Sequence, residues 1–202
     1  VISPGVSLKQ KDKNTDIIRV SYDSPKTPSR TFEYNIKTKE KKLLKEQIIP
    51  SGHNRDDYVV ERLNCESHDG RQIPMTITYH KKTKLDGSAH VLLYGYGSYG
   101  MSMGPSFSST RLSLINRNII WVTCHIRGGM ERGMRWWKEG KMLNKKNTFS
   151  DFISCAKFLI EKKYTSKKKI IVFGGSAGGL LLGSTINQIP DLLLGAIMAV
   201  PF

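Results

Sequence analysis

A serine flanked by small residues is the strongest candidate for chemistry in this chain. Ser176 lies within residues 174–178, Gly-Gly-Ser-Ala-Gly, which match the pattern G-x-S-x-G. The apolar run 170–173 precedes this pattern, and the run 179–183, typical of the start of a buried helix, follows it. A strand, a tight turn and a helix in this order predict a nucleophile elbow, which raises the serine hydroxyl above the end of a sheet.

The groups that would activate such a serine are missing from the residues that follow it. Residues 177–202 contain one carboxylate, Asp191, and no histidine. All five histidines come before the serine: His53, His68, His80, His90 and His125. The triad in this fold follows the chain order serine, acid, histidine, and a serine hydroxyl is a weak nucleophile until a base takes its proton. We therefore expect the triad Asp and His to be absent, and the sequence predicts a carboxy-truncated part of a larger hydrolase.

A second glycine-rich stretch, residues 94–100, also follows an apolar strand. Its glycines match G-x-G-x-x-G, but a dinucleotide site needs a helix next and an acidic residue about 20 positions on. No Asp or Glu occurs between Gly87 and Met130, and Pro105 with small polar residues follows the stretch. A phosphate loop at Gly174 fails too, because leucines stand where Lys and Ser or Thr are required. We predict no cofactor, and a ligand-binding loop at 94–100.

A hydrolase also needs hydrogen-bond donors aimed at the oxyanion that develops during the reaction. The backbone N–H of Ala177, directly after the serine, is one expected donor. A tyrosine phenol from residues 94–100 can be the other, because it stays protonated at neutral pH.

A third stretch at a strand end, residues 125–131, begins with His125 and is followed by Trp136. We interpret it as a structural loop with an aromatic anchor. A catalytic role for His125 is disfavoured, because this histidine precedes the serine.

The formal net charge of +15 raises the alternative of a basic module that binds nucleic acid or an anionic surface. We favour lysines on solvated faces instead, because the basic residues, including Lys145 and Lys146, are spread over loops and helix ends. The longest apolar run, 192–202, is too short to span a bilayer. We therefore expect no specific nucleic-acid partner and no membrane segment.

Three widely spaced cysteines, Cys65, Cys124 and Cys155, form no C-x-x-C pair. They indicate neither a metal site nor a disulfide scaffold, and Cys124 and Cys155 fall in apolar segments typical of a core. A reduced, cytoplasmic setting is expected.

The spacing of apolar residues predicts two kinds of structure. Residues 1–50 predict three short antiparallel strands, near 17–22, 31–36 and 42–45, of the kind that forms part of a propeller blade. Strands then alternate with helices: strands at 90–94, 119–123, 170–173 and 194–201, and helices at 148–163, with Thr148 as N-cap, and at 178–188. This alternation predicts a mostly parallel sheet with helices on both faces, and the strand near 194–200 is expected to leave an exposed edge.

Taken together, four stretches resemble the prolyl oligopeptidase family of serine peptidases, and most closely its oligopeptidase B branch. They are residues 92–100, 126–129, 145–149 and 174–179. The resemblance implies the last strands of a β-propeller in residues 1–50 and an α/β-hydrolase domain, without its C-terminal third, in residues 51–202. It gives Ser176 the role of nucleophile, and it gives the Tyr96 phenol and the Ala177 N–H the role of oxyanion hole.

The same resemblance implies hydrolysis of short peptides after Lys or Arg through an acyl-enzyme. The carboxylates that set this preference, like the triad Asp and His, would lie beyond residue 202. We expect the chain alone to have negligible activity. The alternatives are a non-catalytic remnant, a basic binding module, or a half-enzyme completed by a separate chain.

Overall fold

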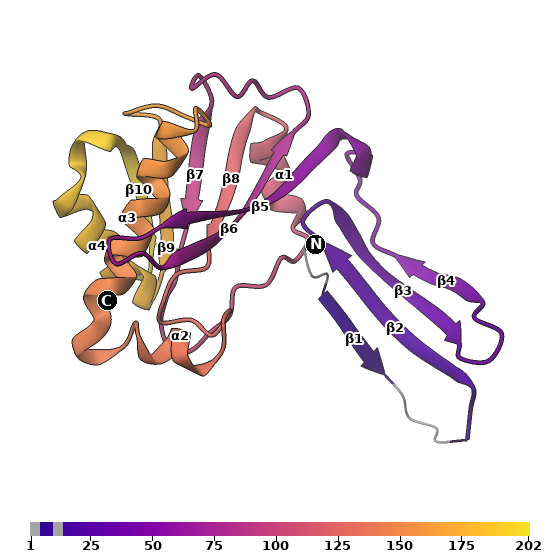
Figure 1. Cartoon of the computed structure of the whole chain (residues 1–202). Coiled ribbons are helices and arrows are strands. Elements are labelled where there is room, and N and C mark those ends of the chain that lie inside the picture. Colours follow the sequence, from indigo (N-terminus) through magenta and orange to yellow (C-terminus); the bar gives the residue numbers. More distant parts are fainter. Residues whose placement is uncertain (1–4, 10–13) are drawn as a thin grey trace.

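The structure, a computed structural model, describes residues 5–9 and 14–202, and the described part contains two β-sheets (Figure 1). The strands are β1 Gly5–Lys9, β2 Ile17–Ser24, β3 Thr27–Asn35, β4 Lys41–Glu46, β5 Tyr58–Glu66, β6 Gln72–His80, β7 His90–Tyr94, β8 Ile119–Cys124, β9 Ile170–Gly175 and β10 Leu193–Ala199. The α-helices are α1 Ser109–Ile115, α2 Met134–Lys138, α3 Lys145–Glu161 and α4 Ala177–Gln188. Short 3₁₀ turns lie at η1 Arg55–Asp57, η2 Met142–Asn144 and η3 Pro190–Leu192.

The N-terminal sheet is a simple antiparallel meander in the order β1-β2-β3-β4. The three strands predicted for this region are confirmed, and the structure adds β1, which was not predicted. The turn between β2 and β3 is tight, because Ser24 pairs with Thr27 and only two residues connect the strands. Figure 1 shows this sheet projecting to one side of the rest of the molecule.

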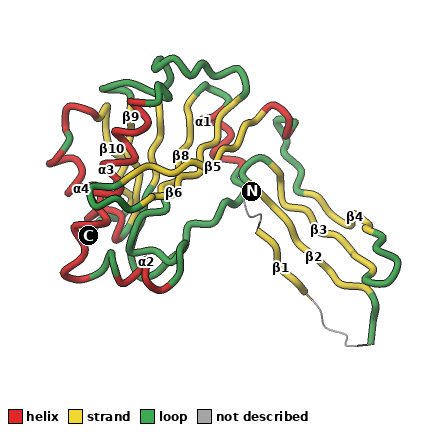
Figure 2. The backbone as a smooth tube through the Cα atoms, viewed as in Figure 1, coloured by secondary structure: helices red, strands yellow, loops and turns green. Residues whose placement is uncertain are grey.

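The turn between β2 and β3 is buried against the second part of the molecule. Pro25 and Thr27 are both buried, and the carbonyl oxygen of Lys26 lies 2.9 Å from Nε2 of His53. The imidazole of His53 in turn stacks on Tyr58 at the start of β5, with ring centroids 5.0 Å apart. The segment that joins the two sheets, drawn in Figure 2 as a loop that ends in a short helical turn, is therefore held at this point.

The second sheet has six strands in the order β10-β9-β7-β8-β6-β5. The strands β10, β9, β7 and β8 run parallel to one another, whereas β6 pairs antiparallel with β8 and β5 antiparallel with β6. This confirms the predicted mostly parallel sheet. Because the parallel strands end at one edge, the loops that follow β7, β8 and β9 meet there, which is where open α/β sheets bind ligands.

Helices cover both faces of this sheet, as predicted (Figures 1 and 2). The larger core packs α3 and α4 against side chains such as Val91 and Leu93 of β7. The smaller core packs α1 against the opposite face, where Leu92 and Trp121 lie. Alternating residues of β7 thus point to different cores. The helices α1 and α2 were not predicted, because at seven and five residues they are too short for a clear apolar period.

The helix α3 begins earlier than predicted, and the predicted N-cap is wrong. Thr148 is the fourth residue of α3, fully buried. Its hydroxyl donates to the carbonyl oxygens of Arg127 at 2.9 Å and Gly140 at 3.0 Å instead of capping the helix. The side chain is used for contact between segments, a role that local sequence does not reveal.

All three cysteines are free and buried, which agrees with the prediction for Cys124 and Cys155. The sulfur atoms of Cys65 and Cys155 lie 3.5 Å apart in the larger core. Within residues 5–9 and 14–202, no helix has the length and apolar character needed to cross a membrane.

Candidate active site

Ser176 occupies the turn between β9 and α4 and has an unusual backbone conformation. Its φ of 51° and ψ of −121° lie in a region that residues other than glycine rarely adopt. Its amide donates to the carbonyl oxygen of Ala199 at 3.0 Å, and its carbonyl accepts the amide of Gly179 at 2.7 Å. The side chain is half-buried. A strained turn that joins a strand to a helix is the geometry that a nucleophile elbow requires.

The glycines around this turn are needed because the loop after β7 packs closely against it. A Cβ atom at Gly174 would lie 3.1 Å from the carbonyl oxygen of Gly95, and one at Gly178 would lie 3.2 Å from the same oxygen. Both distances are tighter than ordinary contacts. The amide of Gly95 donates to the carbonyl of Phe173 at 3.2 Å. The elbow and the tyrosine-containing loop therefore form one closely packed unit.

The two predicted oxyanion donors lie at this unit. Tyr96 follows β7, and a Cβ atom at Gly178 would lie 3.7 Å from its ring carbon Cδ2, so the ring packs beside the first turn of α4. Tyr96 is half-buried. Ala177 is the first residue of α4, and the first amides of a helix have no acceptor within the helix. The amide of Ala177 is thus available to a group beside Ser176.

The five histidines, all in the described part of the chain, make no hydrogen bond to Ser176. His125, at the end of β8, is 2% exposed, and its Nε2 lies 2.8 Å from the Thr76 hydroxyl on β6. Its Nδ1 lies 3.7 Å from Glu131 Oε1, too far for a hydrogen bond. Burial lowers the pKa of His125, although Glu131 opposes the shift. This histidine is held on the side of β8 that is remote from β9.

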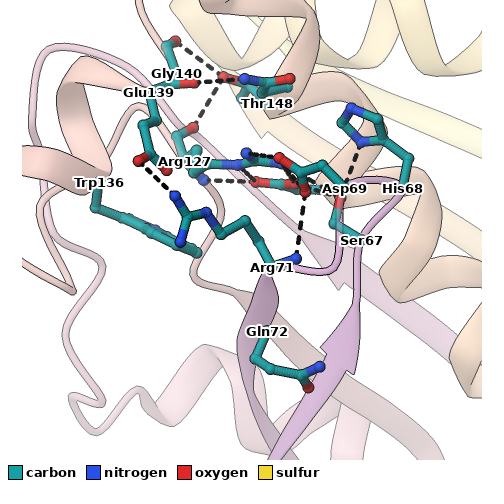
Figure 3. Close-up of polar contacts among 12 residues, drawn as sticks. Ser67, His68, Asp69, Arg71, Gln72, Arg127, Trp136, Glu139, Gly140 and Thr148 are labelled. Atoms are coloured by element: carbon teal, nitrogen blue, oxygen red, sulfur yellow. Dashed lines mark hydrogen bonds and ion pairs between the residues drawn. The ribbon is translucent and has the colours of Figure 1, made fainter.

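The loop that contains His125 has the structural role assigned to it. The indole Nε1 of Trp136 donates to the carbonyl oxygen of His125 at 3.0 Å, and Trp136 is 4% exposed. The side chain of Arg127, two residues on, is 1% exposed and enters a polar cluster (Figure 3).

In that cluster two carboxylates neutralise Arg127. Its Nη2 donates to Asp151 of α3 at 2.6 Å, and its Nη1 donates to Asp69 in the turn between β5 and β6 at 2.5 Å. Burial by itself lowers the pKa of Arg127, but the hydrogen bonds and charges of the two carboxylates raise it. Ser67 completes the cluster by donating to Asp151 at 2.6 Å. The cluster ties the 67–71 hairpin, the loop after β8 and α3 together.

One face of α3 supports several of these loops. Lys145, Thr148 and Asp151 are spaced by three residues, which places them on the same side of a helix. The Lys145 ammonium donates to the carbonyl oxygen of Gly97 at 2.6 Å and to Ser98 Oγ at 2.8 Å. Burial lowers the pKa of Lys145 to about 8. The interpretation of Lys145 as a solvated surface residue is therefore wrong.

A cavity of about 590 Å³ lies on the α1 face of the sheet. Its walls include Tyr94 of β7, Trp121 of β8, Phe173 of β9 and Ile197 of β10. Neither Ser176 nor Tyr96 lines it. The cavity is therefore separate from the elbow.

Comparison with known proteins agrees with this geometry. The sequence profile described as "Prolyl oligopeptidase family" matches residues 105–202. Dipeptidyl aminopeptidase BI of Pseudoxanthomonas mexicana is 44% identical over 95% of this chain, and Protease 2 of Moraxella lacunata is 40% identical over 96%. The matched region, residues 105–202, belongs to the prolyl oligopeptidase family. The chain covers 26% of the first of these relatives and 28% of the second, about a quarter of their length.

Solved structures of the prolyl oligopeptidase family share the arrangement of the described elements. Oligopeptidase B from Leishmania major has a TM-score of 0.87 and 38% identity, with 95% of this chain and 27% of that chain covered. Oligopeptidase B from Trypanosoma brucei with covalently bound antipain has a TM-score of 0.90 and 34% identity, with 98% and 29% covered. These family members are similar to this chain from the N-terminal sheet to β10.

Sequence reasoning named Ser176, Tyr96 and Ala177 but missed the residues that hold their surroundings. Asp151 is fully buried within α3, and a carboxylate among the apolar residues of a predicted helix was the available signal. Lys145 carried no signal, because nothing in a Lys-Lys pair shows which lysine is buried. In the part of the chain that the structure describes, no group of His, Cys, Asp and Glu side chains could hold a metal ion.

Proposed function

We propose that Ser176 is the nucleophile of a serine peptidase that hydrolyses short peptides through an acyl-enzyme. The observation that carries this proposal is the strained turn of Ser176 at the end of β9, packed against the Tyr96 loop. The match of residues 105–202 to the prolyl oligopeptidase family supports the same activity.

In this mechanism Ser176 Oγ attacks the carbonyl carbon of the scissile peptide bond while an imidazole takes its proton. The Tyr96 phenol and the Ala177 N–H donate to the oxyanion of the tetrahedral intermediate. The carbon–nitrogen bond then breaks, and the amine leaves with the proton. Water, activated by the same imidazole, hydrolyses the ester and restores Ser176.

The imidazole and the carboxylate that orients it come, in our proposal, from outside these 202 residues. Two observations support this. The histidine at the end of β8, His125, is bonded to Thr76 on the far side of that strand. Asp191, the one carboxylate after the serine, has a side chain that is 95% exposed, 4.0 Å from Lys168 Nζ. The groups would be supplied by a longer polypeptide or by a separate chain.

We further propose cleavage after Lys or Arg, because the sequence resembles the oligopeptidase B branch. Similarity to Protease 2 and to oligopeptidase B supports this preference. A prolyl endopeptidase of Elizabethkingia meningoseptica, 35% identical over 90% of this chain, makes cleavage after proline the rival specificity. Matched peptide amides with Arg or Pro before the scissile bond would separate the two.

The two sheets suggest that the chain contains parts of two domains. We propose that residues 1–50 form the last part of a β-propeller and that residues 51–202 form part of an α/β-hydrolase domain. The four-stranded antiparallel meander supports the first assignment, and the six-stranded mixed sheet with its elbow supports the second. Three free, buried thiols support a cytoplasmic setting for both.

Fluorophosphonate labelling tests the proposal, since such probes react with a serine that a base has activated. We expect no labelling of the 202-residue chain alone. We expect labelling at Ser176 once the chain is combined with the C-terminal part of the Moraxella lacunata protease, with loss in Ser176→Ala and retention in Ser184→Ala. Labelling that persists in Ser176→Ala would contradict the nucleophile assignment, and labelling of Ser176 in the chain alone would contradict the missing base.

A further inference from the structure

Lys145 is a cation whose polar contacts are all made with the loop after β7. Its ammonium donates to the carbonyl oxygen of Gly97 at 2.6 Å and to Ser98 Oγ at 2.8 Å. No carboxylate pairs with it among residues 5–9 and 14–202. It is the first residue of α3, where the helix dipole disfavours a positive charge. Neither the helix nor an ion pair accounts for a lysine at this position, whereas the loop contact does.

The loop residue that Lys145 contacts is enclosed on its other sides. Gly97 has φ +66°, and a Cβ atom there would overlap the methyl group of Thr148 and lie 2.9 Å from Ile126 Cδ1. A Cβ atom at Gly128 would overlap the carbonyl oxygen of Gly97. The amide of Gly100 donates to the carbonyl of Gly128 at 2.9 Å. Packing thus limits where this loop can lie, and Lys145 provides a charged tie within that space.

Tyr96 stands between two residues with fixed backbones. Gly95 on one side is bonded to Phe173 of β9, and Gly97 on the other side is bonded to Lys145. The direction in which the Tyr96 side chain leaves the backbone is set by these two neighbours. An oxyanion donor contributes most when it is held in place before the reaction begins.

We propose that Lys145 is a positioning residue for the Tyr96 phenol, an inference that rests on the proposed function. Through the Gly97 carbonyl it holds the loop in the one arrangement that keeps the tyrosine ring against the first turn of α4. It does not touch the substrate.

Fluorine NMR of the chain labelled with 3-fluorotyrosine tests this positioning without any need for activity. Tyr96→Phe identifies the Tyr96 resonance by its loss. We expect Lys145→Met to shift and broaden that resonance and to leave the resonances of tyrosines outside residues 94–100 in place, whereas Lys146→Met, which changes the exposed neighbour, leaves all of them unchanged. A Tyr96 resonance that is the same in Lys145→Met as in the wild type would overturn the proposal.

Chemical rescue distinguishes the effect of the ammonium group from the effect of side-chain volume at position 145. Position 145 is half-buried, so a thiol in Lys145→Cys is more open to alkylation than the three native cysteines, which are buried and react poorly. Alkylation with 2-bromoethylamine restores an ammonium at nearly the same reach, and alkylation with iodoacetamide gives a neutral side chain. We expect only the first product to return the Tyr96 resonance to its wild-type position. The same spectrum from both products would overturn the proposal.

Kinetics of the complemented enzyme link the positioning to function. We expect Lys145→Met to lower kcat roughly 10- to 100-fold with little change in KM, because a displaced donor weakens only the transition state. The double variant with Tyr96→Phe should be no slower than Tyr96→Phe alone. If Tyr96→Phe lowers kcat and Lys145→Met does not, the positioning role is overturned and the proposed function stays intact. If no form hydrolyses peptides, the proposed function fails, and the fluorine spectra still decide the role of Lys145.

Discussion

The backbone amide of Ser176 donates to the carbonyl oxygen of Ala199, 3.0 Å away, so the candidate nucleophile is bonded to the end of β10. That strand is paired with β9 alone in the described sheet. The conformation of the turn therefore depends on a strand at the edge of the sheet, and anything that displaces β10 also loosens Ser176.

The exposed part of β10 should cause the chain to self-associate. Leu194 is 53% exposed and Ile197 is 48% exposed, beside an unpaired strand edge that can recruit another chain. We expect Leu194→Lys to reduce association, measured by sedimentation equilibrium, with little change in the free energy of unfolding. Leu193→Lys is the control, since Leu193 is 7% exposed and a charge there should unfold the chain. A monomeric wild type with a reversible two-state melt would contradict this prediction.

Gly128→Ala should be strongly destabilising. A Cβ atom at this position would overlap the carbonyl oxygen of Gly97, and φ is +98°. We expect a loss of ~3 kcal/mol or more in the free energy of unfolding, from urea denaturation. Gly70→Ala is the matched control, because Gly70 has φ +80° and open space around it, and its loss should be only about 1–2 kcal/mol. Equal losses of stability in the two variants would mean that the close contact between Gly128 and the Gly97 carbonyl oxygen does not contribute.

Asp151→Asn should cost far more than Asp69→Asn, although both carboxylates bind Arg127. Asp151 is fully buried, whereas the Asp69 side chain is 34% exposed. Removing one partner of a buried ion pair costs about 3–5 kcal/mol, and a partly exposed pair contributes about 1 kcal/mol or less. Thermal and urea denaturation of the two variants would measure the difference. The reverse order of losses would refute the cluster as the tie between α3 and the hairpin.

The free energy of unfolding should rise with pH between about 8 and 10.5 because of Lys145. Burial lowers the pKa of Lys145 from 10.5 to about 8 in the folded chain. In this window the unfolded chain holds a proton that the folded chain has released, so stability increases with pH. Below this pH window Lys145 is charged in both the folded and the unfolded chain, so the full cost of burying its charge lowers the stability.

Denaturation curves at several pH values would show this effect as a difference between variants. We expect a shallower rise in Lys145→Met than in the wild type and an unchanged rise in Lys146→Met. Identical slopes in the wild type and Lys145→Met would show that Lys145 keeps its ordinary pKa.

The regular elements and the chemical motifs were predictable, since both follow from short stretches of sequence. The run before Ser176 and the helix after it show the elbow directly, and the apolar strands show the parallel sheet. The hairpin at residues 67–71 also has a local cause, because an Asp-Gly pair favours a tight turn and Gly70 adopts the positive φ that such a turn needs, +80°.

The supporting contacts could not be predicted, because they join residues far apart in the chain. Arg127 and Asp69 are 58 residues apart, and Lys145 and Gly97 are 48 apart. Thr148 resembles a helix cap by its type and position, yet its hydroxyl is needed by two carbonyl groups of other segments. Local preference was overridden at these positions by tertiary contacts.

The shared face of α3 limits how freely this protein can change. Segments 67–71, 95–100 and 126–129 all depend on Lys145, Thr148 or Asp151, so none of the three can gain or lose residues without disturbing the others. Sequence changes and engineered grafts should instead be tolerated at Gly104, where a Cβ atom would meet nothing within 4 Å. A designer who wished to add a new loop to this protein would start there.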